Sequence, residues 1–288
     1  MGLTARFLVL FILLLPGVAA SAADLHPPTQ VVAGSSFSIP SNGGGKATFY
    51  LLGPSHVLKR EVNLGQAIAV DGDDVQTSGK YLAIACTGHS CDSASFYVVA
   101  GNPDRLSFLL HPSRVPVSAG GAINATAFVF DNFKNLVLKP VTVDFHVTPK
   151  NGAPFTKTVK AERGVAWMKM SSTPKEGPVK VTATIGSAAE PRIMQQVASD
   201  ACNLRIKASR TAKGVLVETD PVRDCSGNAV PDGTIVSFTA VDSKGKTTVD
   251  APIKKGIART ELPLSGNARI SVASGVVIGN EITVGGRS

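Results

Sequence analysis

Four cysteines carry the clearest chemistry in this sequence. Cys86 and Cys91 are separated by a short turn, whereas Cys202 and Cys225 lie at the open ends of two strand-like segments. An even number of cysteines in an oxidising compartment predicts disulfide bonds, and four cysteines allow three pairings. Because antiparallel pairing around each turn brings the local partners together, we predict the bonds 86–91 and 202–225. The longer loop is expected to stabilise its domain by about 3 kcal/mol on the chain-entropy model, and the shorter loop by less.

Trp167 is the only tryptophan, and strand alternation places it on the same face as Lys169. An exposed tryptophan beside a cation can stack on a sugar or anchor a protein partner, so these two residues are candidate ligand contacts. The more ordinary interpretation is that Trp167 packs under a loop or against a neighbouring domain, since single exposed apolar residues are common.

The segment Asp71-Gly72-Asp73-Asp74 places three carboxylates in one loop. Calcium prefers oxygen-rich loops, but the EF-hand spacing is absent, so a solvated turn is the favoured interpretation. The cysteine spacings match no common zinc pattern, and the sequence has no G-x-S-x-G or H-E-x-x-H motif. We therefore predict no catalytic, cofactor-binding or metal residues, and a protein that is not an enzyme.

Residues 1–22 have the pattern of a secretory signal peptide. Arg6 precedes an apolar run from Phe7 to Leu15, and Ala20-Ser21-Ala22 fits the small-x-small cleavage rule. The run is too short to span a bilayer, and no later segment is long and apolar enough to be transmembrane. The sequence thus predicts export to the periplasm, the cell surface or the medium.

The elements that position the candidate residues are strands. Residues 141–147 alternate without a break, which directs Val141, Val143, Phe145 and Val147 to a core. Residues 179–185 alternate in the same way. One apolar face on each strand requires a second sheet to cover it, so the predicted fold is an all-β sandwich.

A pattern of five residues occurs twice at a spacing of 93 positions. It consists of Asp131, Asn135, Val137, Val143 and Phe145 in the first copy, and of Asp224, Asn228, Val230, Val236 and Phe238 in the second. A repeat of this length indicates two copies of one domain. The repeat aligns Trp167 with Arg259 and predicts that both side chains point outward.

The second copy resembles the bacterial Ig-like repeat of invasin and intimin proteins. The residues that carry the resemblance are Asp224-x-x-Gly227-Asn228-x-Val230-Pro231-Asp232-Gly233-Thr234-x-Val236-x-Phe238. Segment 105–198 is similar, although Lys134 stands where the turn glycine would be and the Pro-Asp-Gly element is missing. Across residues 105–288, the resemblance implies tandem immunoglobulin-like sandwiches that serve as spacers and adhesive modules and have no catalytic residues.

The predicted organisation is a signal peptide (1–22), an Ig-like sandwich (23–102) and two bacterial Ig-like domains (103–199 and 200–288). The first sandwich rests on a loose tyrosine corner, in which Tyr81 opens a strand leading to Cys86. The junctions around residues 102–104 and 198–200 are short, which predicts a semi-rigid row of domains.

Positive charge is concentrated in segment 105–198, which has 12 basic and 5 acidic residues and a net charge of +7. Such a surface attracts anionic polysaccharide or headgroups, although solvation of a two-sided sheet is the more ordinary interpretation. Long basic runs and interleaved aromatic residues are missing, so nucleic acid is not an expected partner.

These features predict a non-enzymatic exported protein with a structural or adhesive display role in the cell envelope, where its partner is an unidentified protein or polysaccharide. The alternative is a secreted carbohydrate- or protein-binding module that uses the basic middle domain.

Overall fold

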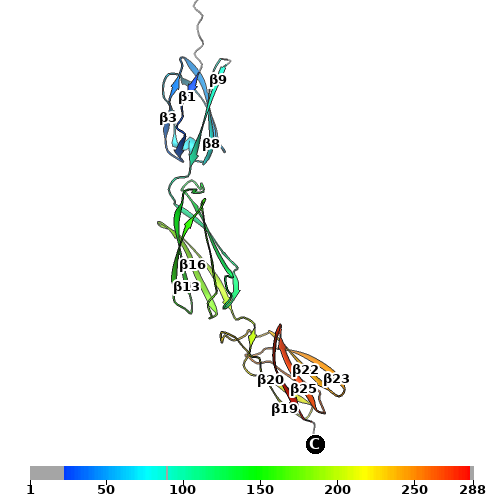
Figure 1. Ribbon diagram of the computed structural model, residues 1–288. Coiled ribbons are helices and arrows are strands. Elements are labelled where there is room, and N and C mark those ends of the chain that lie inside the picture. The colour runs from blue at the N-terminus through cyan, green and yellow to red at the C-terminus, as the bar shows by residue number, and fades with distance from the viewer. Residues whose placement is uncertain (1–22, 89, 286–288) are drawn as a thin grey trace, which may run out of the picture. The chain divides into compact units, whose positions relative to one another are not determined.

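The computed structural model describes residues 23–88 and 90–285, so the predicted signal peptide at residues 1–22 lies outside the described residues. Within the described ranges, the regular elements are strands apart from one short 3-10 turn, η1 (Gly72–Val75). The chain divides into two compact units, one ending at Gly101 and one beginning at Asn102 (Figure 1). The strands form tandem immunoglobulin-like sandwiches, which confirms the predicted fold class.

The first unit contains a five-stranded sheet in the order β2-β9-β8-β5-β6, together with the two small sheets β1-β4 and β3-β7. Its strands are β1 (Asp24–Leu25), β2 (Gln30–Val32), β3 (Phe37–Ile39), β4 (Ser41–Asn42), β5 (Lys46–Leu52), β6 (Val57–Asn63), β7 (Ile68–Val70), β8 (Gly79–Thr87) and β9 (Ser90–Val99). The pairing of β2 with β9 is parallel, whereas the other pairs are antiparallel.

Tyr81 anchors the core of this unit. Its ring stacks on Phe96 with 5.5 Å between centroids, and its hydroxyl donates a 3.0 Å hydrogen bond to the Thr77 carbonyl. Burial raises the pKa of the Tyr81 phenol. A tyrosine near the start of a strand that bonds to the backbone a few residues upstream is the tyrosine corner that the sequence predicts.

The second sandwich packs a three-stranded sheet, β10-β12-β15, against a five-stranded sheet, β11-β17-β16-β13-β14. Its strands are β10 (Arg105–His111), β11 (Arg114–Pro116), β12 (Ile123–Phe130), β13 (Val141–Pro149), β14 (Phe155–Ala161), β15 (Val165–Met170), β16 (Gly177–Ile185) and β17 (Ala188–Val197). The rings of Phe108 on β10 and Phe145 on β13 lie 5.8 Å apart and join the two layers.

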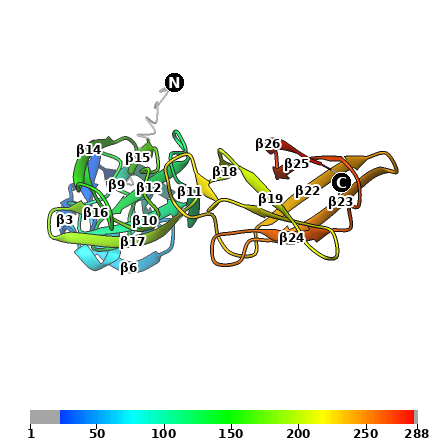
Figure 2. The same cartoon turned by 90° about the horizontal axis from the view of Figure 1, so that it is seen from below.

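The third sandwich repeats this plan with the sheets β19-β20-β24 and β23-β22-β25-β26, and adds the small sheet β18-β21. Its strands are β18 (Ala201–Cys202), β19 (Ile206–Arg210), β20 (Val215–Thr219), β21 (Arg223–Asp224), β22 (Ile235–Asp242), β23 (Gly245–Pro252), β24 (Arg259–Leu262), β25 (Ala268–Ser274) and β26 (Val277–Val284). In Figure 2, β24 lies on one side of this sandwich, and β25 and β26 lie on the other.

The predicted alternation holds in both copies of the repeat. Val143 and Phe145 on β13 are fully buried, as are Val236 and Phe238 at the repeated positions on β22. Val141 is only partly buried, because it begins its strand. The five-residue repeat therefore marks the same inward positions in two sandwiches.

The two strand-like segments between Cys202 and Cys225 are expected at residues 204–208 and 214–223, as the two strands of one hairpin. The structure divides the second of these segments. Strand β20 ends at Thr219, and the chain re-forms a ladder only at β21, which pairs with β18. Pro221 lies in the gap, and proline has no N–H to continue a ladder. The turn of the inner hairpin is closed by a 2.9 Å bond from the Thr211 N–H to the Gly214 carbonyl.

The repeated aspartate and asparagine form the same buried turn twice. In the second sandwich, Asp131 Oδ1 accepts the backbone N–H groups of Phe133 and Asn135, and Oδ2 accepts the Asn135 side-chain amide. In the third sandwich, Asp224 makes the same contacts with Ser226 and Asn228. Buried polar backbone groups need partners, so this carboxylate satisfies a turn that would otherwise be costly to bury.

The turn keeps its geometry even where the expected glycine is missing. Gly227 has a φ of 83°, and Lys134, which occupies the equivalent position, has a φ of 68°. A left-handed conformation costs a residue with a Cβ about 1–2 kcal/mol, whereas glycine adopts it readily. The Asp131 hydrogen bonds thus hold Lys134 in a conformation that its side chain disfavours.

Replacing Lys134 by glycine should therefore raise the stability of the second sandwich by about 1 kcal/mol. Denaturant unfolding followed by the fluorescence of Trp167, which lies in the same sandwich, measures the change. Lys134→Ala is the matched control, because alanine removes the charge but retains the Cβ. An equal gain in both variants would show that charge, and not backbone conformation, is responsible.

Candidate functional site

The three-stranded sheet of the second sandwich presents an outward surface that we call the Trp167 face. It consists of the outward side chains of β10, β12 and β15, namely Arg105, Ser107, Leu109, His111, Asn124, Thr126, Phe128, Phe130, Val165, Trp167 and Lys169. Cross-strand partners point to the same side of a sheet, so the strand register fixes which of these side chains are neighbours.

Trp167 lies in the central row of this face. It pairs with Thr126, which pairs in turn with Leu109 on the far strand. Trp167 is 61% exposed and Leu109 is 57% exposed. Two strand spacings separate them, a distance of about 10 Å. The outward direction predicted for Trp167 from the repeat is the one observed.

Lys169 lies in the next row, which contains Lys169, Asn124 and His111. The predicted pair of Trp167 and Lys169 thus shares one face and one strand, two residues apart. None of the eleven outward residues of the face is acidic. The face therefore combines exposed apolar groups with positive charge.

Sequence reasoning missed the apolar partners of Trp167. Phe128 and Val165 pair with each other in the row beside it, and Phe130 continues the stripe along β12. All three side chains are partly buried although they point outward. The sequence does indicate them, because Phe128 and Phe130 occupy outward positions of β12 at which polar residues are expected.

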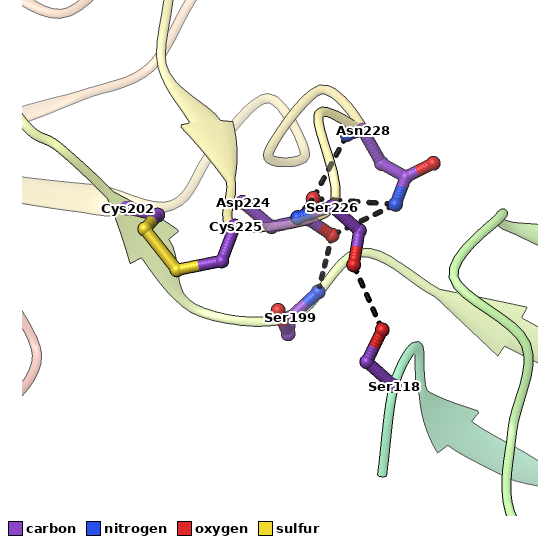
Figure 3. Close-up of a disulfide and its surroundings, with 7 residues drawn as sticks. All are labelled: Ser118, Ser199, Cys202, Asp224, Cys225, Ser226 and Asn228. Carbon is purple, nitrogen blue, oxygen red and sulfur yellow. Dashed lines mark hydrogen bonds between the residues drawn. A yellow bond between two sulfur atoms is a disulfide. The ribbon is translucent and has the colours of Figure 1, made fainter.

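Both predicted disulfides are present. Cys86 and Cys91 are cross-strand partners at the end of the β8–β9 hairpin, with Cα atoms 4.0 Å apart. Cys202 on β18 is bonded to Cys225, which directly follows β21, with Cα atoms 4.9 Å apart (Figure 3). The second bond therefore fixes the beginning of the third sandwich beside the Asp224 turn.

The Asp224 turn lies next to this disulfide and also contacts the incoming chain. Asp224 Oδ2 accepts a 3.1 Å hydrogen bond from the Ser199 N–H, in addition to the bonds within the turn (Figure 3). Burial raises the pKa of the Asp224 carboxyl, but the hydrogen bonds from Asn228, Ser199 and Ser226 outweigh burial and lower the pKa below its ordinary value. The carboxylate is thus held in its charged form.

Asn228 extends this turn to the second sandwich. Its side-chain amide donates a 2.8 Å bond to the Pro174 carbonyl, and its Oδ1 accepts a 3.3 Å bond from the Glu176 N–H. The hydroxyls of Ser226 and Ser118 are hydrogen-bonded at 2.8 Å (Figure 3). Asp224, Asn228 and Ser226, which we call the junction turn, therefore link the third sandwich to the second.

The acidic loop at residues 71–74 engages neighbouring protein groups. Its last residues form η1, in which Asp73 accepts a 2.9 Å bond from the Gln76 amide, and Asp74 lies 3.6 Å from the His56 ring. Over residues 23–88 and 90–285, the structure contains no group of three or more His, Cys, Asp or Glu side chains that could hold a metal ion. Two of the three carboxylates in this loop therefore lie next to partners within the protein.

The described part of the chain has no helix of the length and apolar character needed to cross a membrane.

Comparison with known proteins finds similar structures but no similar sequences. Protein-family models and curated proteins give no match. The solved structure of FdeC, an adhesin of Escherichia coli, superposes with a TM-score of 0.63 at 14% identity, covering 94% of this chain and 98% of that one. InvD of Yersinia pseudotuberculosis gives a TM-score of 0.50 at 11% identity, covering 92% and 98%.

These likenesses extend over nearly the whole length of each chain, so they include every sandwich of this one. The chain has the tandem Ig-like fold found in bacterial adhesins of the invasin type, and the resemblance read from residues 105–288 is confirmed at the level of the fold. A fold shared at such low identity does not by itself define a function.

Removal of the Asn228 side chain should loosen the junction turn. In Asn228→Ala the Glu176 N–H loses its acceptor, so its hydrogen exchange should become at least tenfold faster, which corresponds to about 1.4 kcal/mol. Exchange measured by NMR on the full chain tests this expectation.

Asn135→Ala is the matched control, because Asn135 occupies the equivalent position in the second sandwich. It should leave exchange at Glu176 unchanged. If both variants accelerate exchange equally, the effect is a general loss of stability and the junction contact has no separate role.

Proposed function

We propose that this protein is an exported, non-enzymatic tandem Ig-like protein that displays a binding surface at the cell envelope and acts in adhesion or in envelope structure. The proposed division is a signal peptide at residues 1–22 and sandwiches at residues 23–102, 103–199 and 200–288. The protein would act by binding a partner, and the sandwiches would hold the binding surface in place.

The observation that carries the proposal is the combination of an exposed binding face and a fixed support in the same unit. Trp167 and Leu109 are exposed on one sheet of the second sandwich. The loop at residues 174–176 of that sandwich is bonded to Asn228 of the third. A side chain held by packed strands and a bonded junction loses little freedom on binding, which favours affinity.

Two further observations support export and adhesion. The two disulfides are typical of proteins that fold in an oxidising compartment outside the cytosol. FdeC, which shares the fold along 94% of this chain, is described as an adhesin. The second candidate function is a secreted binding module. It would use the same Trp167 face, but the protein would not be attached to a cell.

The location of the protein separates these functions. A tagged full chain should be cleaved by added protease on intact cells if it displays its face at the surface. Cleavage only after permeabilisation would place it in the periplasm and would contradict adhesion. Recovery from the medium alone would favour the secreted binding module.

A further inference from the structure

We propose that the Trp167 face binds an anionic polysaccharide, with Trp167 stacking on a sugar ring and Lys169 pairing with a carboxylate or sulfate group of the same chain. This inference rests on the proposed function, because it names the class of partner that the displayed surface would hold.

The position of Trp167 suits stacking on a flat ligand. It lies on β15, which is an edge strand of its sheet, so only one strand of that sheet lies beside it. Phe128 and Val165 fill the row on one side of the indole, and Thr126 lies across from it. Stacking of a ligand on an aromatic ring is most effective when neighbouring side chains hold the ring and exclude water around it.

Polar side chains on the face are available to a ligand. In the described part of the chain, the side chains of Asn124, Thr126 and Lys169 make no hydrogen bond or ion pair with another residue. Asn124 can both donate and accept, as can Thr126, and Lys169 only donates. Sugars present a dense set of hydroxyl groups, so this mixture of donors and acceptors is suited to them.

The arrangement of these groups favours a polysaccharide over a protein partner. Protein interfaces usually have an apolar centre and a polar rim. Here the central row places the Thr126 hydroxyl between Leu109 and Trp167, and Asn124 lies between His111 and Lys169. The central row therefore alternates apolar and polar groups, and the row beside it is polar throughout. A sugar chain, with its C–H faces and hydroxyl edges, can contact both rows at once.

The charge of the face selects an anionic chain. Lys169, Arg105 and His111 are its titratable groups, and none of the other outward residues is acidic. Arg105 Nε lies 3.3 Å from the Oδ2 atom of Asp104, which precedes the strand and is not part of the face. Segment 105–198 also has a net charge of +7, which attracts a polyanion from a distance.

The length of the face indicates a polymer. Leu109 and Trp167 are separated by about 10 Å, and both remain exposed. A single sugar stacked on Trp167 would not reach Leu109, so the full face is used only by a chain of two or more sugars.

The chain contains its own reporter for this proposal, since Trp167 is the only tryptophan. The purified full chain is titrated with alginate, a polyuronate, and with dextran, a neutral glucan. We expect a saturable change in tryptophan fluorescence with alginate and no change with dextran, and a weaker affinity at high salt because charge contributes to binding.

Two pairs of variants locate the site, with binding measured on immobilised alginate. Lys169→Glu and Trp167→Ala should each lower the affinity at least tenfold. The matched controls lie on the opposite sheet of the same sandwich: Lys180→Glu makes the same charge change on β16, and Ile193→Ala removes an exposed apolar side chain from β17. Both controls should stay within twofold of the parent, and circular dichroism checks that each variant is folded.

Three results would overturn the inference. They are the absence of alginate binding, equal binding of dextran, and an equal loss of affinity in Lys169→Glu and Lys180→Glu, which would indicate attraction to net charge alone. None of these results alters where the protein is located. If the chain is accessible on intact cells but does not bind alginate, the display function stands and the partner is of another class.

Discussion

The central strands of each sandwich have one apolar face, and that face must be covered. Because side chains alternate along a strand, Val143 and Phe145 on β13 necessarily share a side, and the structure buries both fully against the facing sheet that carries Phe108. The third sandwich repeats the arrangement with Val236 and Phe238. This single requirement fixes the two-layer architecture, and it also sets the register, since a slip of one residue would expose the core.

The outward side chains of the strands are not needed to fill the core. They are therefore available to contact other molecules. Apart from Ile193, the five-stranded sheet of the second sandwich has a largely polar outer face, in which His146 is hydrogen-bonded to Thr156 and Thr184. The opposite sheet differs, because Leu109, Phe128 and Trp167 are apolar in the outward phase. Several large apolar side chains that share one outward face are the feature on which the proposed binding role rests.

Much of this organisation could be predicted from sequence because it depends on local patterns. Alternation predicted the strands, spacing around turns predicted both cysteine pairs, and the repeat predicted the outward direction of Trp167. The structure was needed where the outcome depends on pairing between distant segments. Leu109 joins Trp167 only through the register of three strands, and Asn228 reaches Pro174 across 54 residues of sequence. The left-handed conformation of Lys134 could not be predicted either, because lysine disfavours it and the hydrogen bonds of the buried Asp131 carboxylate impose it.

In the proposed function, a partner is held at the Trp167 face and at no other part of the second sandwich. The most direct measurement is a map of backbone amide chemical shifts on the full chain during titration with a short uronate oligosaccharide. We expect the perturbed amides to cluster on β10, β12 and β15, with the largest changes around Trp167 and Lys169. Perturbations centred on β13, β16 and β17, or scattered evenly over the lysines of the chain, would contradict it.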